Sequence, residues 1–169
     1  GTLAGRVVVY QRTHGLDGDD PRTATPVPIT LSVGTTTRYD GACDAAQIET
    51  VTLVPDEPLD EQSTYTLAIL AGVTTTDGVP FLPSPTWALV RQPDDPVTVT
   101  AQGAIVANET PLTDPAQIRA LDGWWKAAAT GLAFLDATGV AERSQILVAW
   151  ELTTQTTSDP LDPAIAGSV

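Results

Sequence analysis

The sequence predicts a mainly β fold: a β-sandwich with one long helical insertion before its last strand. Short runs of β-branched and apolar residues recur along the first two-thirds of the chain. Glycine, proline and Asp-Gly turn signals separate these runs, as in sandwiches. The hydrophobic period then changes to that of a helix, and a final alternating run follows.

Five strands are expected before the helix. The run 6–10 is β-branched, and 27–33 alternates apolar and polar residues. The run 50–54 is closed by Pro55, and 64–70 places Tyr65, Leu67 and Ile69 on one face. The run 86–90 is the fifth predicted strand. Asp-Gly pairs between these runs predict tight turns.

The helical insertion is expected at about 114–139. Asp114 is an N-cap acceptor, Pro115 suits the first helical position, and Gly139 suits the C-terminal cap. A helix over residues 115–138 would be roughly 36 Å long. Gly123 and Gly131 each weaken it by about 1 kcal/mol, so packing against an apolar sheet face or edge must hold it. One apolar face collects residues at spacings of three and four: Ile118, Leu121, Trp125, Ala128, Leu132 and Leu135.

The last predicted strand is 146–154. Its alternation puts Val148, Trp150 and Leu152 on one face with Ile146, and we expect Trp150 in the core. Residues 1–155 are therefore predicted to form one domain. Residues 156–169 are rich in Thr, Ser, Asp and Pro, and are interpreted as a linker toward a further domain downstream.

The composition excludes several classes of protein. Eight Lys and Arg against 21 Asp and Glu give a net charge of −13, which disfavours a nucleic-acid partner. No run approaches the ~18 apolar residues of a membrane span. One cysteine, Cys43, allows no internal disulfide, and one Cys with one His cannot build a zinc site of that type. With no methionine, the chain is expected to be a segment of a longer protein.

Three segments resemble bacterial sequences. Residues 59–67 (LDEQSTYTL) resemble a pattern shared by fibronectin type III and bacterial immunoglobulin-like domains. The segment 71–80 (AGVTTTDGVP) resembles a turn of bacterial immunoglobulin-like domains. The segment 150–155 (WELTTQ) resembles their closing strand, with Leu152 in place of the usual Phe. The resemblance implies an immunoglobulin-like or fibronectin-III-like β-sandwich. Tyr65 would then lie across a sandwich corner, with its hydroxyl bonded to backbone upstream.

Residues 78–155 are similar to the immunoglobulin-like region that precedes the catalytic domain of some secreted bacterial lipases and esterases, including the virulence-factor type. The match includes the strand entry at 83–85 (Pro-Ser-Pro). It implies a non-catalytic accessory, spacer or interaction domain of a secreted or cell-surface bacterial protein, with the downstream domain as its partner. Members normally carry strands before the equivalent of 6–10. A truncated domain and a strand supplied from elsewhere both remain open.

Candidate chemistry is sparse. No Gly-x-Ser-x-Gly elbow is present, and His14 is the only histidine, so this segment is predicted not to be an enzyme. Asp17, Asp19 and Asp20 cluster in one polar loop, and carboxylate oxygens suit Ca²⁺. The loop is interpreted either as a solvated acidic loop or as a calcium site. No other cofactor is expected.

The pair Trp124-Trp125 offers a second candidate site. Adjacent helical side chains point about 100° apart, so both rings cannot face one core. Trp125 is predicted in the core. Trp124 is expected to pack at its rim or to offer a ring to a partner or a sugar. The alternative function is therefore a carbohydrate- or cell-surface-binding module that uses Trp124 or Trp87. Its contact would be made through the helix or a sheet edge.

Overall fold

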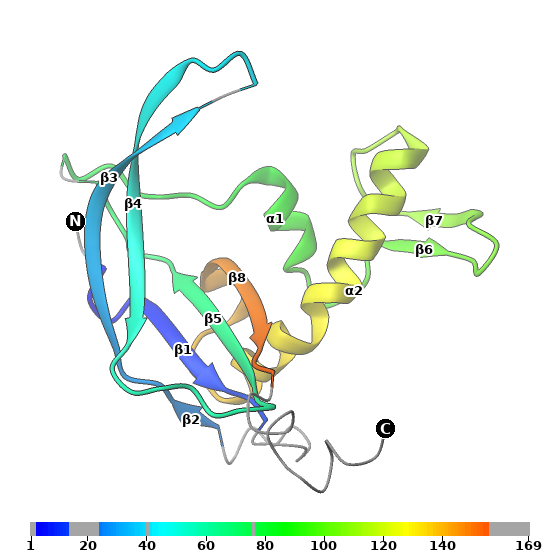
Figure 1. Ribbon diagram of the computed structural model, residues 1–169. Coiled ribbons are helices and arrows are strands. Elements are labelled where there is room, and N and C mark those ends of the chain that lie inside the picture. Colours follow the sequence, from blue (N-terminus) through cyan, green and yellow to red (C-terminus); the bar gives the residue numbers. More distant parts are fainter. Residues whose placement is uncertain (1–2, 14–23, 40, 76, 156–169) are drawn as a thin grey trace, which may run out of the picture.

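The computed structural model describes residues 3–13, 24–39, 41–75 and 77–155 (Figure 1). In this part of the chain the fold is mainly β, with antiparallel sheets and one long helix. The predicted linker, 156–169, lies outside the described residues.

A central antiparallel sheet organises the fold. Among the described residues its order is β2 (Thr25–Pro26), β1 (Val7–Gln11), β5 (Thr64–Leu70) and β8 (Ile146–Thr153). Three of the predicted strands are confirmed here: 6–10, 64–70 and 146–154. Strand β5 is covered on both sides, because Tyr65 and Leu67 are buried on one face while Thr66 and Ala68 are buried on the other.

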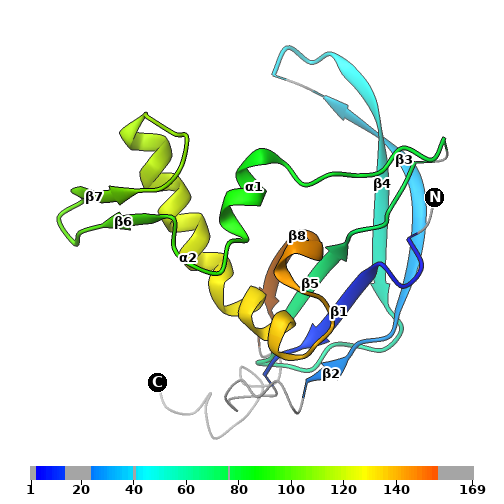
Figure 2. The same ribbon diagram turned by 180° about the vertical axis from the view of Figure 1, so that it is seen from behind.

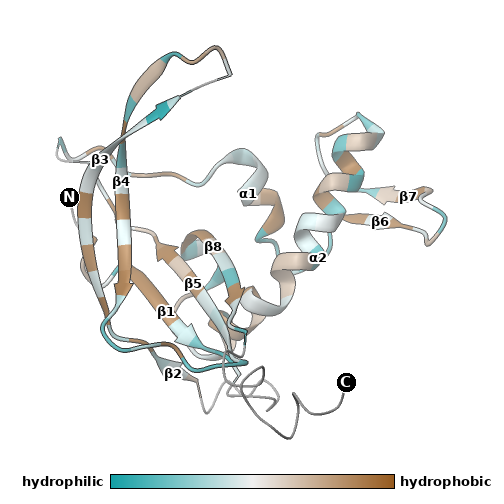
Figure 3. Cartoon of the chain, in the orientation of Figure 1, coloured by the Kyte–Doolittle hydropathy of each residue, from teal (hydrophilic) through white to brown (hydrophobic). Residues whose placement is uncertain are grey.

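A long hairpin covers one face of this sheet. It consists of β3 (Ile29–Tyr39) and β4 (Ala45–Pro55), which extend the predicted strands 27–33 and 50–54. Ile29 and Leu53 pack with Val9, Tyr65 and Leu67. In the part of the hairpin nearest the sheet, hydrophobic residues alternate with residues of intermediate hydropathy (Figure 3). Its other end extends beyond the sheet (Figures 1 and 2) and is exposed on both faces.

Tyr65 is bonded to the backbone just upstream of β5. Its side chain is buried, and the Asp60 N–H donates a 2.8 Å hydrogen bond to its hydroxyl oxygen. Burial raises the pKa of the Tyr65 hydroxyl. The corner therefore fixes the entry of the chain into β5.

The long helix covers the opposite face of the sheet. Helix α2 (Pro115–Ala137) begins after Asp114, whose Oδ1 accepts from the Ala116 N–H at 2.9 Å, and Gly139 has a φ of +70° just beyond its end. These observations confirm the predicted helix before the last strand. Its second half, with Leu132 and Leu135, packs against Ala68, Leu70 and Ile146 of the sheet.

The first half of α2 packs on smaller elements. These are α1 (Pro85–Val90) and the hairpin of β6 (Val97–Val99) and β7 (Ile105–Asn108). Ile118 and Leu121 of α2 meet Val90 and Val97 there. The β6–β7 hairpin was not expected from the sequence. A short 3-10 helix, η2 (Arg143–Gln145), then leads into β8.

Three sequence predictions are wrong in detail. The segment 86–90 is not a strand but lies in helix α1, because Ser84 caps the helix and Pro85 begins it. Trp150 is not in the core, because β8 is the edge strand of the described sheet and Trp150 is 41% exposed. Trp125 is half-buried rather than buried, and its indole N–H donates to the Gln92 carbonyl at 2.9 Å.

Candidate functional site

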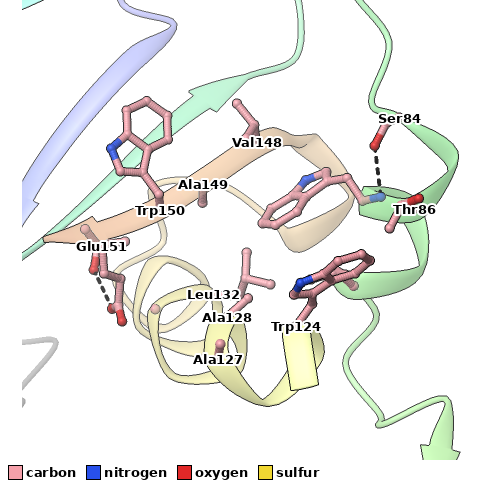
Figure 4. A pocket seen from close by; sticks show the side chains of 14 residues that line it. Ser84, Thr86, Trp124, Ala127, Ala128, Leu132, Val148, Ala149, Trp150 and Glu151 are labelled. Carbon is pink, nitrogen blue, oxygen red and sulfur yellow. Dashed lines mark hydrogen bonds between the residues drawn. The ribbon is translucent and has the colours of Figure 1, made fainter. Parts of the chain in front are cut away.

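A groove of about 600 Å³ lies between strand β8 and the two α-helices (Figure 4). Three of its lining residues are tryptophans, and we call it the tryptophan groove. Strand β8 contributes four consecutive residues, 148–151, and β5 contributes Thr66. The helices contribute the remaining wall: the N-cap Ser84 with Thr86, Trp87 and Val90 of α1, and Trp124, Ala127, Ala128, Gly131 and Leu132 of α2.

The groove runs along the edge of β8 opposite β5, which pairs with no strand among the described residues, and we call it the open edge. Trp150 lies opposite Leu67 on the sheet face that carries the long hairpin. Ala149 lies opposite Ala68 on the face that packs on α2. Residues from both faces of one strand can line the same cavity only where that cavity reaches the strand's edge. The backbone edge of β8 is therefore part of the groove.

Helix α1 fixes the position of Trp87. The Ser84 hydroxyl accepts from the Trp87 backbone N–H at 3.1 Å, which caps the helix. The Trp87 indole N–H donates to the Ile146 carbonyl at 3.0 Å, and Arg91 donates to the same oxygen at 2.9 Å. These bonds join α1 to the start of β8. Trp87 is thus held as a fixed wall of the groove.

Helix α2 provides the wall facing β8. Trp124, Ala128 and Gly131 recur at spacings of four and three, so they share one face of the helix. Gly131 lies close to Glu151: a Cβ placed there would lie 2.7 Å from the Glu151 Oε1 atom, so the carboxylate would have to move. Small residues on this face leave the groove open beside β8. Glycine at position 131 weakens the helix in isolation, but in the fold it leaves space for the Glu151 side chain.

Among the described residues, Glu151 is the only ionisable one that lines the groove. Its Oε1 atom lies 3.0 Å from Arg12 Nε and accepts from the Thr66 hydroxyl at 3.1 Å. The Arg12 and Glu151 side chains are only 12% and 27% exposed. Arg12 therefore neutralises the Glu151 carboxylate, and Thr66 orients it. The surface presented to a ligand is largely apolar.

Two tryptophans differ from the others in exposure. Trp124 is 55% exposed and Trp150 is 41% exposed. Within the described part of the chain, no hydrogen bond is found for either indole N–H, whereas Trp87 and Trp125 both donate to carbonyls. Indole rings of this kind combine a large apolar surface with a free donor, as ligand-contacting tryptophans do. Figure 4 shows Trp124 and Trp150 on different elements around the groove.

The predicted site residues have different outcomes. Trp124 lines the groove and is 55% exposed, and its role as a binding residue stays a prediction. The proposed calcium ligands Asp17, Asp19 and Asp20 lie outside the described residues, as does His14. Across the ranges that the structure describes, no group of three or more His, Cys, Asp or Glu residues could hold a metal ion.

Sequence reasoning did not place Trp150 in the site. The alternation of β8 indicates which residues share a face, but it does not tell which strand is at the edge of the sheet.

Comparisons with protein-family models, with curated proteins and with solved structures find no match for this chain. None of the helices in the described ranges is long and apolar enough to cross a membrane.

Proposed function

We propose that this chain is a non-catalytic interaction module that binds a polypeptide partner in the tryptophan groove. One observation carries the proposal: the exposed rings of Trp124 and Trp150 line the same cavity as the open edge of β8. Apolar pockets with a few fixed polar groups are the usual form of binding sites. Exposed tryptophans are also the residues that most often dominate binding energies.

The polar inventory of the groove favours a polypeptide over a sugar. A sugar carries many hydroxyl groups that need hydrogen-bond partners. The groove lining offers few polar side chains, and Thr66, Ser84 and Glu151 already bond within the protein. Carbohydrate binding remains the second candidate, because exposed indole rings are suitable stacking surfaces for sugars.

The setting is proposed from the sequence resemblance. We infer an immunoglobulin-like accessory domain of a secreted or cell-surface bacterial protein, positioned before a lipase or esterase domain. The acidic, lysine-poor composition suits such a location. The buried Tyr65 corner supports the immunoglobulin-like interpretation, because this contact is typical of such sandwiches.

A paired screen tests the function. The purified chain is exposed to a peptide-display library and to an array of cello-, xylo- and chito-oligosaccharides. Binders are then measured against Trp124→Ala and Trp150→Ala. Tyr39→Ala is the matched control, because Tyr39 is 66% exposed and lies on the long hairpin, away from the groove.

Loss of a buried aromatic contact typically costs 2 kcal/mol or more at a binding hot spot, about thirtyfold in affinity. We expect peptide binders that lose at least about tenfold in affinity with either groove variant and are unaffected by Tyr39→Ala. Binders that respond only to the Tyr39 variant, or no binder of either class, would contradict the proposal.

A further inference from the structure

We propose that the partner binds as an added β-strand, with its backbone paired to the open edge of β8. This inference rests on the proposed function and specifies how the groove would be used. Strand addition is a known mode of peptide recognition in which backbone hydrogen bonds supply affinity and side-chain pockets supply specificity.

The hydrogen-bond pattern shows which groups of β8 are free. In the described sheet β8 has one neighbour, β5. The Thr154 N–H donates to the Ser63 carbonyl at 2.9 Å, which fixes the phase of the antiparallel ladder. Backbone groups alternate in direction along a strand, so those of Trp150 and Leu152 also face β5. The N–H and C=O groups of Ala149 and Glu151 therefore face the groove.

A row of such groups specifies the chemistry of its partner. The Ala149 and Glu151 amides are two residues apart, which corresponds to about 6.8 Å along an antiparallel strand. A second strand presents complementary donors and acceptors at the same repeat. Edge strands with free backbone groups are templates for pairing with another chain. Isolated side chains or sugar hydroxyls do not have this periodicity.

The groove has room for an added strand. Neighbouring strands lie about 4.8 Å apart. The α2 wall opposite β8 contains Ala127, Ala128 and Gly131, whose small side chains keep the space beside the edge unfilled. Alternate side chains of an added strand would then point to the two sides of the sheet. One side offers Trp150 and Val148, and the other offers the α2 wall with Trp124.

Charge indicates that the partner is basic. The chain has 21 acidic residues against eight basic ones, so its field repels an anionic segment. The groove lining itself is close to neutral, because Glu151 is paired with Arg12. The expected partner is thus an extended segment with apolar or β-branched residues in the middle and Lys or Arg at its ends. Its association rate should fall with ionic strength.

The test uses a defined set of peptides. The probe is acetyl-Lys-Thr-x-Thr-x-Thr-Lys-amide, where x is Val, Ile, Leu or Tyr. One control carries Glu in place of Lys, and another has every backbone amide N-methylated. N-methylation removes the donors but keeps the side chains. Binding is followed by tryptophan fluorescence, and amide hydrogen exchange is measured for β8 with and without peptide. Cellohexaose is the carbohydrate probe.

The proposal predicts a specific pattern. The basic peptides bind, N-methylation lowers affinity at least about tenfold because hydrogen bonds are lost, and the acidic version binds more weakly at low salt. The Ala149 and Glu151 amides become protected by at least about tenfold. The Val148 and Trp150 amides change little, because β5 already pairs with them. Trp150→Ala weakens binding while Tyr39→Ala does not.

Each other outcome overturns a defined part. Tryptophan-dependent peptide binding without protection of Ala149 and Glu151 would overturn strand addition and leave the proposed function standing. Tryptophan-dependent binding of cellohexaose but of no peptide would overturn both strand addition and the polypeptide partner, in favour of the carbohydrate candidate. Binding of neither probe would contradict the use of the groove altogether.

Discussion

The contact between Gly131 and Glu151 allows one prediction to be developed in detail. In an ordinary helix, replacing an interior glycine by alanine stabilises the protein by about 1 kcal/mol. At position 131 a Cβ would lie 2.7 Å from the Glu151 Oε1 atom. That oxygen is the atom that lies 3.0 Å from Arg12 and 3.1 Å from the Thr66 hydroxyl.

The added methyl group must therefore displace the Glu151 carboxylate. A hydrogen bond to a charged group contributes about 1.5–3 kcal/mol, and the largely buried Arg12 would lose part of its compensation. The loss exceeds the gain in helix propensity, so Gly131→Ala should destabilise the chain by about 1 kcal/mol. In a Glu151→Ala background the obstruction is absent, and the same change should stabilise by about 1 kcal/mol.

The assay is urea unfolding of the four members of the cycle, followed by circular dichroism and extrapolated linearly. The expected coupling between positions 131 and 151 is about 2 kcal/mol. Gly123→Ala is the matched control on the same helix, because nothing lies within 4 Å of a Cβ at that position. If Gly131→Ala instead stabilises the wild-type chain as much as Gly123→Ala does, that result would refute the contact described between Gly131 and Glu151.

Three further predictions concern the fold. Tyr65→Phe removes the acceptor of the Asp60 N–H and should lower the free energy of unfolding by about 1–2 kcal/mol, whereas Tyr39→Phe should not, as measured by urea unfolding. Folding raises the pKa of Tyr65, so the neutral hydroxyl adds to the free energy of unfolding below about pH 10. This contribution is lost as the pH rises above that value. Unfolding curves between pH 9 and 11 should therefore show a smaller decline for Tyr65→Phe than for wild type; equal declines would contradict this. Replacing 34–50 of the exposed hairpin end by Asn-Gly should change the free energy of unfolding by less than about 0.5 kcal/mol, and a larger loss would show that this end contributes to the core.

Local signals in the sequence predicted much of the fold. Asp114 and Gly139 marked the ends of α2 to within two residues, because caps are local chemistry. The alternation of 64–70 and 146–154 predicted β5 and β8 of the central sheet, because burial of one face of a strand needs a period of two. Segment 86–90 was wrongly predicted as a strand, because a short apolar run is compatible with either a strand or a helix. There Ser84 and Pro85 were the deciding signals.

The candidate site was predicted only in part. Trp124 could be singled out, because two adjacent tryptophans cannot both face one core. Trp150 could not, since its exposure depends on β8 lying at the edge of the sheet, and strand order is set by contacts distant in sequence. The groove itself joins β5, α1, α2 and β8. No local pattern reports such an arrangement.

The most direct test is amide hydrogen exchange along β8 with and without the basic strand peptides. If the groove binds a partner at its open edge, the Ala149 and Glu151 amides slow by at least about tenfold and those of Val148 and Trp150 do not. Protection confined to the exposed end of the long hairpin, or unchanged exchange in β8 at saturating peptide, would contradict the account.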